Sequence, residues 1–160
     1  MMDFRVGFGY DSHRFASGRP LVIGGVTIPY ESGLAAHSDG DVLLHAVCDA
    51  LLGAAGLKDI GTWFPDTDDT YKNADSTQLL AKVVEVIQGK GWMVNNLDCT
   101  LVLEKPKMKP YIDDIITKLS QMLGAPTDNI AVKAKTNEKM GFTGAGEGIA
   151  AVAAVTLRKM

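Results

Sequence analysis

The sequence predicts an α+β fold, in which a mixed four-stranded sheet has helices on one face, as in a ferredoxin-like sandwich, and a small hairpin beside it. The first observation is the order of the segments, which reads strands, helix, helix, strand, helix, strand, strand. The second is the final segment, residues 149–158, which is apolar on both of its alternating faces. Such a strand is buried on both faces. Helices on one face leave the other for a partner subunit, so we expect self-association.

Glycines and helical spacing mark the elements of the first half. Gly24 and Gly25 turn a hairpin that follows a first strand. Apolar residues recur at helical spacing after Asp41, and Gly56 suits the carboxyl-terminal cap of that helix. The expected elements are a strand over residues 5–10, a hairpin over 20–29, a polar loop over 33–40 and a helix over 41–55.

Capping residues mark the elements of the second half. Asp75, with Gln78 three residues later, resembles a capping box at the start of a helix, and Gly124 suits the end of a later one. The expected elements are a polar loop over residues 58–73, helices over 75–89 and 111–123, and strands over 97–104, 130–135 and 149–158.

Composition and charge exclude several classes of protein. A chain of 160 residues fits one core, so we expect residues 1–160 to form a single domain. The net charge of −3 argues against binding of nucleic acid through a basic surface, and we expect no membrane association because no apolar run is long enough to span a bilayer. The amino end lacks the plan of a signal peptide. We expect a cytoplasmic bacterial protein, or the mature form of an organellar one.

All three histidines fall within the first 45 residues, each beside carboxylates or hydroxyls. Asp11 and His13 are two residues apart, so an extended strand places both on one face. His45 belongs to the first turns of the helix expected after residue 40. One Asp and two His ligands with an open fourth position are typical of a catalytic zinc site.

Other interpretations of these residues stay open. Cys48 lies three residues after His45 and could share its helix face, but oxygen and imidazole ligands suit a metal that engages phosphates, so we favour Asp11. Asp11 and His13 could instead form a hydrogen-bonded structural pair. His45 could be a core histidine, and His37 a loop residue bonded to its neighbours.

A second candidate site follows the strand expected over residues 130–135. Lys133 and Lys135 alternate along that strand, and Thr136 and Glu138 come next. One interpretation is a strand edge protected by charge. The functional interpretation is a phosphate clamp, in which Lys135 and Thr136 contact phosphate oxygens. Glu138 would hold a second cation there, since Mg2+ binds through one or two carboxylates plus substrate phosphates.

Together these segments resemble the family of the 2-C-methyl-D-erythritol 2,4-cyclodiphosphate synthases, which belong to the non-mevalonate isoprenoid pathway. The matching stretches span nearly the whole chain in the order of that family. Two of them are especially specific: His37-Ser38-Asp39-Gly40-Asp41 and Phe64-Pro65-Asp66-Thr67-Asp68. The others include Gly9-Tyr10-Asp11-Ser12-His13, Pro106-Lys107-Met108, Lys135-Thr136-Asn137-Glu138 and Gly141-Phe142-Thr143-Gly144.

The resemblance implies a homotrimer with active sites at the subunit interfaces, and it implies catalytic roles for His37 and Thr136. The implied metal ligands are Asp11, His13 and His45 for one Zn2+ per subunit with an open position, and Glu138 for Mg2+ or Mn2+ bound with the substrate diphosphate. The residues implied to contact the substrate, which carries a cytidine diphosphate, are Ser38, Asp59, Gly61, Asp66, Leu103, Pro106, Lys107, Met108, Ala134, Lys135, Thr136 and Phe142.

The implied reaction cyclises 4-diphosphocytidyl-2-C-methyl-D-erythritol 2-phosphate to 2-C-methyl-D-erythritol 2,4-cyclodiphosphate and releases CMP. The nucleophile is the substrate's own phosphate, so the obstacle is repulsion between anions, which metal ions reduce. We therefore interpret His37 as a positioning group. Two alternatives remain: a metal-dependent phosphohydrolase, in which the same zinc activates water, and a non-catalytic metal-binding trimer.

Overall fold

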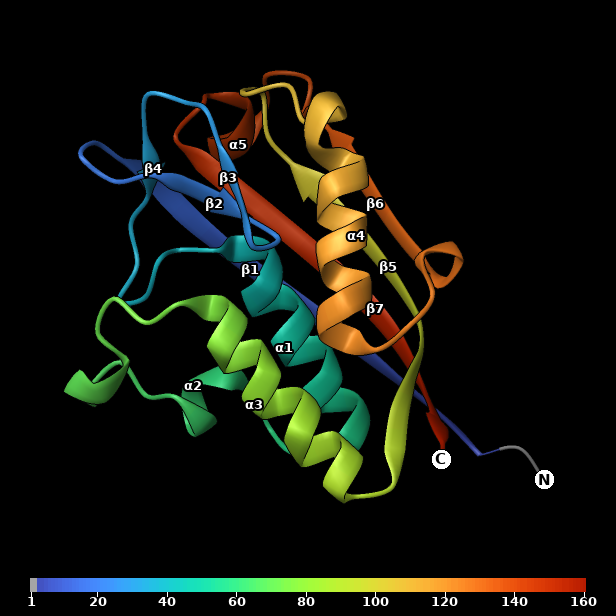
Figure 1. Cartoon of the computed structure of the whole chain (residues 1–160). Helices are drawn as coiled ribbons and strands as arrows, with labels where there is room; N and C mark the ends of the chain where they lie inside the picture. Colours follow the sequence, from blue (N-terminus) through green and yellow to red (C-terminus); the bar gives the residue numbers. More distant parts are fainter. Residues whose placement is uncertain (1–2) are drawn as a thin grey trace.

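A mixed β-sheet forms the centre of the computed structural model, which describes residues 3–160 (Figure 1). The strand order is β4-β1-β7-β5-β6, and the β5–β6 pair is the parallel one. The strands of this sheet are β1 (Phe4–Ala16), β4 (Gly33–Leu34), β5 (Trp92–Val102), β6 (Ile130–Lys135) and β7 (Gly148–Lys159). Beside it, β2 (Leu21–Ile23) and β3 (Val26–Ile28) form the predicted hairpin around Gly24 and Gly25.

The α+β class and the mixed sheet are confirmed, and two details differ from the expectation. A two-residue strand, β4, pairs with the end of β1 and adds a fifth strand to the four that the sequence predicted. The element order also differs from the β-α-β-β-α-β order of a ferredoxin-like sandwich. The difference arises after β5. The chain there passes through a helix, residues 112–123, and then forms β6, which pairs with β5 in the parallel direction.

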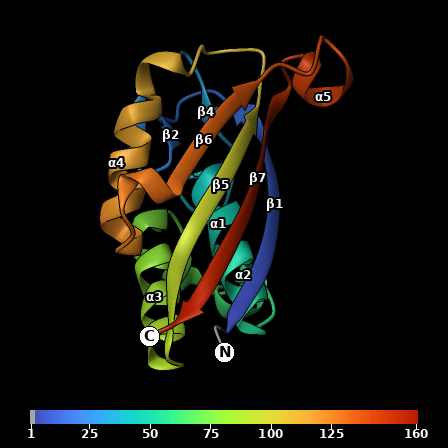
Figure 2. The same ribbon diagram turned by 90° about the vertical axis from the view of Figure 1, so that its right-hand side faces the viewer.

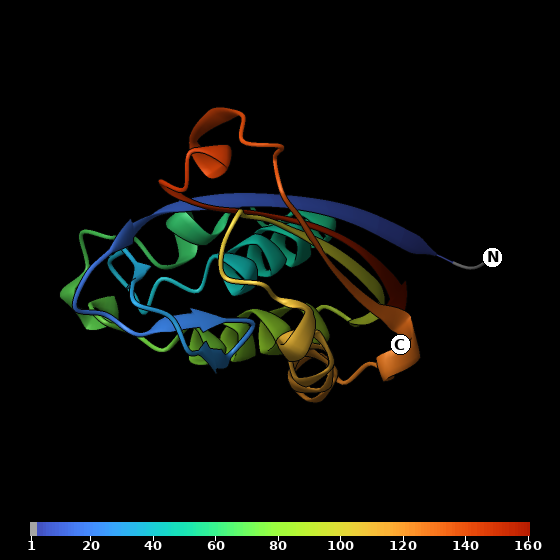
Figure 3. The same ribbon diagram turned by 90° about the horizontal axis from the view of Figure 1, so that it is seen from above.

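Helices cover one face of the sheet, as the sequence predicts (Figures 1 and 3). The long helices are α1 (Val42–Ala55), α3 (Ser76–Gly89) and α4 (Ile112–Leu123). The predicted ends at Gly56 and Gly124 are confirmed, because both glycines cap their helices in the left-handed conformation. Within residues 3–160, no helix is long and apolar enough to cross a bilayer.

Several short elements escaped the sequence analysis because a single turn is too short to show periodicity. They are α2 (Ile60–Trp63), α5 (Gly141–Gly144) and the 3-10 turns η1 (Asp69–Tyr71), η2 (Lys109–Tyr111) and η3 (Thr127–Asn129). The segment that carries α5 lies at one end of the sheet, on the side away from the long helices (Figures 2 and 3).

The face of the sheet that the long helices leave uncovered is apolar along β1. Large side chains there are 50% to 74% exposed, namely those of Phe4, Val6, Phe8 and Tyr10. On β7, the alternate residues Ile149, Ala151, Ala153, Val155 and Leu157 are buried beneath the helices. An exposed apolar face of this kind is typical of an interaction surface. Burial of this face by a partner subunit stays a prediction.

Two glycines on β1 let the strand lie directly on α1. A Cβ at Gly7 would come within 1.8 Å of the Ala50 carbonyl oxygen, and one at Gly9 within 1.9 Å of the Ala46 carbonyl oxygen. The residues of α1 that face these glycines are alanines, so the backbones of the strand and the helix are in direct contact. This contact sets the distance between the β1 residues after Gly9 and the first turn of α1.

Asp41 joins the hairpin to the start of α1. It is fully buried and caps the helix by accepting the backbone N–H of Leu44. Its two carboxylate oxygens also accept the N–H groups of Gly24 and Gly25, at 2.9 and 2.7 Å. Burial raises the pKa of Asp41 to about 6, against the lowering effect of these N–H groups.

We expect Asp41→Ala to lower the free energy of unfolding far more than Asp75→Ala. Each aspartate caps a helix, and loss of a cap costs about 1 kcal/mol. Asp41→Ala also leaves two N–H groups of the hairpin turn without their acceptor, at about 1–3 kcal/mol each. Urea unfolding of the two variants gives the comparison, and equal losses of stability would contradict this role of Asp41.

Candidate functional site

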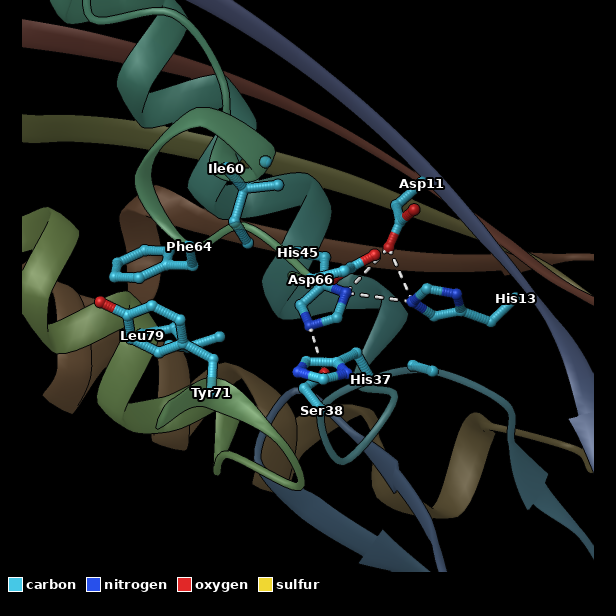
Figure 4. A pocket seen from close by; sticks show the side chains of 12 residues that line it. Asp11, His13, His37, Ser38, His45, Ile60, Phe64, Asp66, Tyr71 and Leu79 are labelled. Carbon is cyan, nitrogen blue, oxygen red and sulfur yellow. Dashed lines mark hydrogen bonds and ion pairs between the residues drawn. The ribbon is translucent and has the colours of Figure 1, made fainter. Parts of the chain in front are cut away.

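Asp11, His13 and His45 meet where β1 crosses the first turns of α1 (Figure 4). Asp11 and His13 follow Gly9 on the helix-facing side of β1, and His45 lies one turn into α1. The donor atoms Asp11 Oδ2, His13 Nε2 and His45 Nδ1 are 3.0 Å apart in each of the three pairs. The predicted convergence of these three side chains is confirmed.

This donor set fits a divalent cation. Zinc–ligand distances of about 2.0–2.1 Å in a tetrahedral site place two donors about 3.3 Å apart. The three spacings of 3.0 Å agree with that value to within a few tenths of an ångström. The oxygen and imidazole donors suit an ion that also engages phosphate. The group could therefore bind a metal ion.

The charges within this group favour cation binding. Burial by itself would raise the pKa of Asp11, but hydrogen bonds and charge from His13 and His45 outweigh it, and the pKa falls to about 2. Burial by itself would lower the pKa of His45, yet the Asp11 carboxylate outweighs that effect and the pKa is raised. Asp11 is thus ionised at neutral pH, and a metal ion competes with a proton for the His45 nitrogen.

Cys48 takes no part in this group. Its side chain is fully buried in the core, and burial raises the pKa of its thiol. A buried neutral thiol behaves as a small apolar side chain. The structure therefore places Asp11, and not Cys48, with the two histidines.

A pocket of about 330 Å³ opens beside the three donors; we call it the first pocket. Seven of the predicted site residues line it: Asp11, His13, His37, Ser38, His45, Gly61 and Asp66. Asp59 does not line it, but caps α2, which carries Gly61, by accepting the N–H of Thr62 at 2.8 Å. Hydrogen bonds from Thr62 lower the pKa of the Asp59 carboxyl.

The first pocket also has an apolar wall, which was not predicted from the sequence. Ile60, Phe64, Tyr71 and Leu79 line the side opposite the metal-binding group (Figure 4). Phe64 and Tyr71 pack edge to face with their ring centroids 5.2 Å apart. Three of the four lie in a segment that the sequence analysis treated as a polar loop. The spacing of Ile60 and Phe64, which suits one face of a helical turn, was the available signal.

A second pocket, of about 410 Å³, lies between the ends of β5 and β6 and the start of α4. Seven predicted residues line it: Leu103, Pro106, Lys107, Met108, Ala134, Lys135 and Thr136. Glu104 lines it as well, together with Lys109 and Ile112, and the last two were missed. The two pockets share no lining residue, so the predicted site is divided between two places on this chain.

Glu138 belongs to a loop at the edge of the second pocket. The hydroxyl of Thr136 donates to Glu138 Oε1 at 3.2 Å, and Glu138 is exposed. Glu138 and Lys139 both have positive φ, at 51° and 62°, a conformation that costs a non-glycine residue about 1 kcal/mol or more. Glu104 Oε1 accepts the N–H groups of Asn137 and Lys139, each at 3.1 Å, and so holds the loop in this form.

Phe142 lies apart from both pockets. It lines a third, smaller cavity with Ser12, His13, Arg14 and Glu147. His13 is shared between this cavity and the first pocket. The structure thus places Phe142 behind the metal-binding group and not beside the lysines of the second pocket.

Relatives of known name match this chain over nearly its whole length. The 2-C-methyl-D-erythritol 2,4-cyclodiphosphate synthase of Bacillus cytotoxicus is 56% identical over 156 residues, which are 98% of this chain and 99% of the relative. A solved 2C-methyl-D-erythritol-2,4-cyclodiphosphate synthase in a CDP-bound form is 38% identical with a TM-score of 0.88, covering 96% of this chain and 99% of that one. The bifunctional IspDF of Campylobacter jejuni reaches a TM-score of 0.96 at 41% identity, and this chain covers 43% of it.

The family profile agrees with these matches. The profile of the YgbB family matches residues 4–158, which include the metal-binding group and both pockets. The resemblance that the sequence motifs indicated is thereby confirmed. The chain belongs to the YgbB family, together with the 2-C-methyl-D-erythritol 2,4-cyclodiphosphate synthases that it matches from end to end.

Proposed function

We propose that this chain is a 2-C-methyl-D-erythritol 2,4-cyclodiphosphate synthase, a phosphorus–oxygen lyase of the non-mevalonate isoprenoid pathway. The observation that carries the proposal is the Asp11-His13-His45 group in the wall of a pocket, in a chain whose relatives of equal length bear that name. We propose further that residues 1–160 act as one domain and that the enzyme works in the cytoplasm.

The proposed reaction closes a ring within one substrate molecule. An oxygen of the 2-phosphate attacks the phosphorus atom nearer the erythritol, and the bond from that phosphorus to the bridging oxygen breaks. CMP leaves with the bridging oxygen, so no water is consumed. The 2-phosphate has its second pKa near about 6 and is largely dianionic at pH 7, so it needs no strong general base. Positioning and charge neutralisation are therefore the tasks of the protein.

The first pocket would hold the methylerythritol 2-phosphate. The hydroxyl of Ser38 would donate to the phosphate, and His37 would position it. Gly61 and Asp66 would surround the sugar hydroxyls, Asp59 would hold the turn of α2 that carries Gly61, and the apolar wall would keep water away from the reacting atoms. Holding two groups of one molecule in the reactive orientation is worth about 7–11 kcal/mol, so this pocket supplies a large part of the acceleration.

The second pocket would hold the cytidine diphosphate. Lys107 and Lys135 would bind its phosphates, and Thr136 would turn its hydroxyl from Glu138 to donate to them. Leu103, Pro106, Met108 and Ala134 would contact the nucleoside. Glu138 would hold Mg2+ or Mn2+ beside Thr136. When bound, that ion and Zn2+ at Asp11, His13 and His45 would neutralise phosphate charge as Lewis acids, a contribution of several kcal/mol. Phe142 would contact the substrate from the third cavity, which it lines together with His13.

We propose that the active form is a homotrimer with each active site at an interface between subunits. Two observations support this. The substrate must reach both pockets, and in one chain they share no residue. The uncovered sheet face exposes four large apolar side chains of β1, which a neighbouring subunit would bury.

Phosphorus NMR of the reaction tests the proposed function. The protein is incubated with 4-diphosphocytidyl-2-C-methyl-D-erythritol 2-phosphate, Zn2+ and Mg2+. We expect the cyclic diphosphate and CMP in equal amounts. A metal-dependent phosphohydrolase would instead release inorganic phosphate, or CMP together with an uncyclised methylerythritol bisphosphate, and a non-catalytic metal-binding trimer would leave the substrate unchanged. Either of those results would overturn the proposal.

A further inference from the structure

The two ring nitrogens of His45 face different surroundings. Nδ1 points at Asp11 and His13, with both donor atoms at 3.0 Å. Nε2 points the other way and lies 2.9 Å from Ser76 Oγ and 3.0 Å from Ser38 Oγ. A neutral imidazole carries its proton on one nitrogen and offers a lone pair on the other. A metal ion at Nδ1 therefore requires the proton on Nε2, and in metal sites an acceptor commonly lies beside that proton and fixes its position.

Ser76 is placed to be that acceptor. It is the first residue of α3, it is fully buried, and its hydroxyl donates to Asp39 Oδ1. A carboxylate accepts hydrogen bonds and has no proton to give, so the direction of this bond is settled. Because the hydroxyl hydrogen of Ser76 is used in this way, only its oxygen lone pairs remain for His45.

Asp39 is itself held in place by backbone groups. Its Oδ2 accepts the N–H of Ser76 at 3.1 Å, and its Oδ1 accepts the N–H of Asp41 at 3.1 Å. Its own N–H donates to the carbonyl of Ala74 at 3.0 Å. These bonds join the loop before α1 to the start of α3. The carboxylate of Asp39 thus has a defined position and orientation.

We propose that Asp39 and Ser76 are positioning residues of the metal centre, which keep the proton of His45 on Nε2 and leave Nδ1 free to bind the ion. The inference rests on the metal centre of the proposed function and goes beyond it, because neither residue touches the ion or the substrate. Residues that orient a metal ligand in this way commonly change metal affinity by about 10- to 100-fold.

The same arrangement has a consequence for Ser38. Its oxygen accepts the N–H of Gly40 at 3.3 Å and lies beside the protonated Nε2 of His45. Two donors therefore face the oxygen, and its own hydrogen is free for an acceptor in the first pocket. With the proton of His45 on Nε2, Nδ1 can therefore bind a cation, and the hydroxyl of Ser38 can donate to an anion.

Zinc affinity tests the inference, measured by competition with a chelator on the full-length chain. We expect Ser76→Ala to weaken zinc binding by about 10- to 100-fold. Asp39→Asn should also weaken it, because one amide oxygen cannot accept all three bonds that the carboxylate accepts. Ser120→Ala is the matched control, since its hydroxyl donates to the carbonyl of Ala125 far from the metal-binding group, and its zinc affinity should equal that of the wild type.

A second measurement separates positioning from a merely structural role. The measurement is NMR of zinc-loaded protein labelled with 15N-histidine. The chain has three histidines, so the ring nitrogen signals are few. We expect the Nε2 proton of His45 to be protected from exchange in the wild type and to exchange faster in Ser76→Ala, because that variant removes its acceptor. If the wild type binds zinc and both variants bind it equally well, the inference is overturned and the metal centre stands. If the wild type binds no zinc, both are overturned.

Discussion

His45→Ala is expected to abolish stable zinc binding and to lower turnover by about 10³-fold, while the chain stays folded. The variant keeps two of three protein donors, Asp11 and His13. A Lewis acid at a phosphoryl oxygen contributes several kcal/mol, and about 1.4 kcal/mol corresponds to a factor of ten in rate. His13→Ala should behave in the same way. The measurements are zinc content after gel filtration, the rate of CMP release, and circular dichroism.

His37→Ala is the matched control for these two variants. His37 lines the same pocket, but its Nε2 lies 3.4 Å from the carbonyl oxygen of Asp68 and outside the metal-binding group. It should keep a full complement of zinc while losing activity through weaker positioning of the substrate. Full activity in a zinc-free His13→Ala or His45→Ala protein would end the metal-centre proposal.

The second large effect is expected for Glu138→Gln, which should raise the Mg2+ concentration for half-maximal activity by about tenfold or more. A carboxylate attracts a divalent cation by several kcal/mol even at an effective dielectric constant of about 20, and 1.4 kcal/mol is a factor of ten in binding. Glutamine keeps the size of the side chain in its positive-φ loop and can still accept from Thr136. The change therefore isolates the charge.

A magnesium titration of CMP release measures this effect. Glu85→Gln serves as the control, because Glu85 is an exposed residue on the outer side of α3. At saturating Mg2+ we expect the Glu138→Gln variant to recover much of its rate. A titration curve that coincides with that of the wild type would reject the role of Glu138 as a cation ligand.

The sequence was sufficient where the signal was local. Asp11 and His13 share a strand face by their spacing, Asp75 caps a helix, and Gly56 and Gly124 end the helices before them. Even here the structure refines the pattern. Asp75 caps α3 by accepting the N–H of Thr77, and not that of Gln78 as a capping box requires. Local rules therefore predicted the longer elements and the shared face of Asp11 and His13, whereas the approach of His45 was inferred from the clustering of the three histidines.

Contacts between distant segments could not be predicted from spacing. The strand expected over residues 5–10 continues to Ala16, because β7 pairs with it as far as Arg14 and β4 pairs with its last two residues. β5 begins at Trp92, before the expected start, since the ladder to β7 continues across a bulge at Val94/Asn96. Ser76, which lies 31 residues after His45, has the ordinary features of a helix start, and only the packing of α3 against α1 brings it to the imidazole.

The glycines of β1 have a consequence for metal selectivity. Two donors lie on the strand and the third on the helix, so the gap between their backbones determines the size of ion that the three can reach together. A methyl group at Gly9 would enlarge this gap by at least about 1 Å, since real Cβ contacts under 3.0 Å essentially do not occur. Metal–ligand distances vary by only about 0.2 Å around their usual values. Gly7 and Gly9 carry no reactive group, yet they set the spacing between the strand and the helix that hold the three donors.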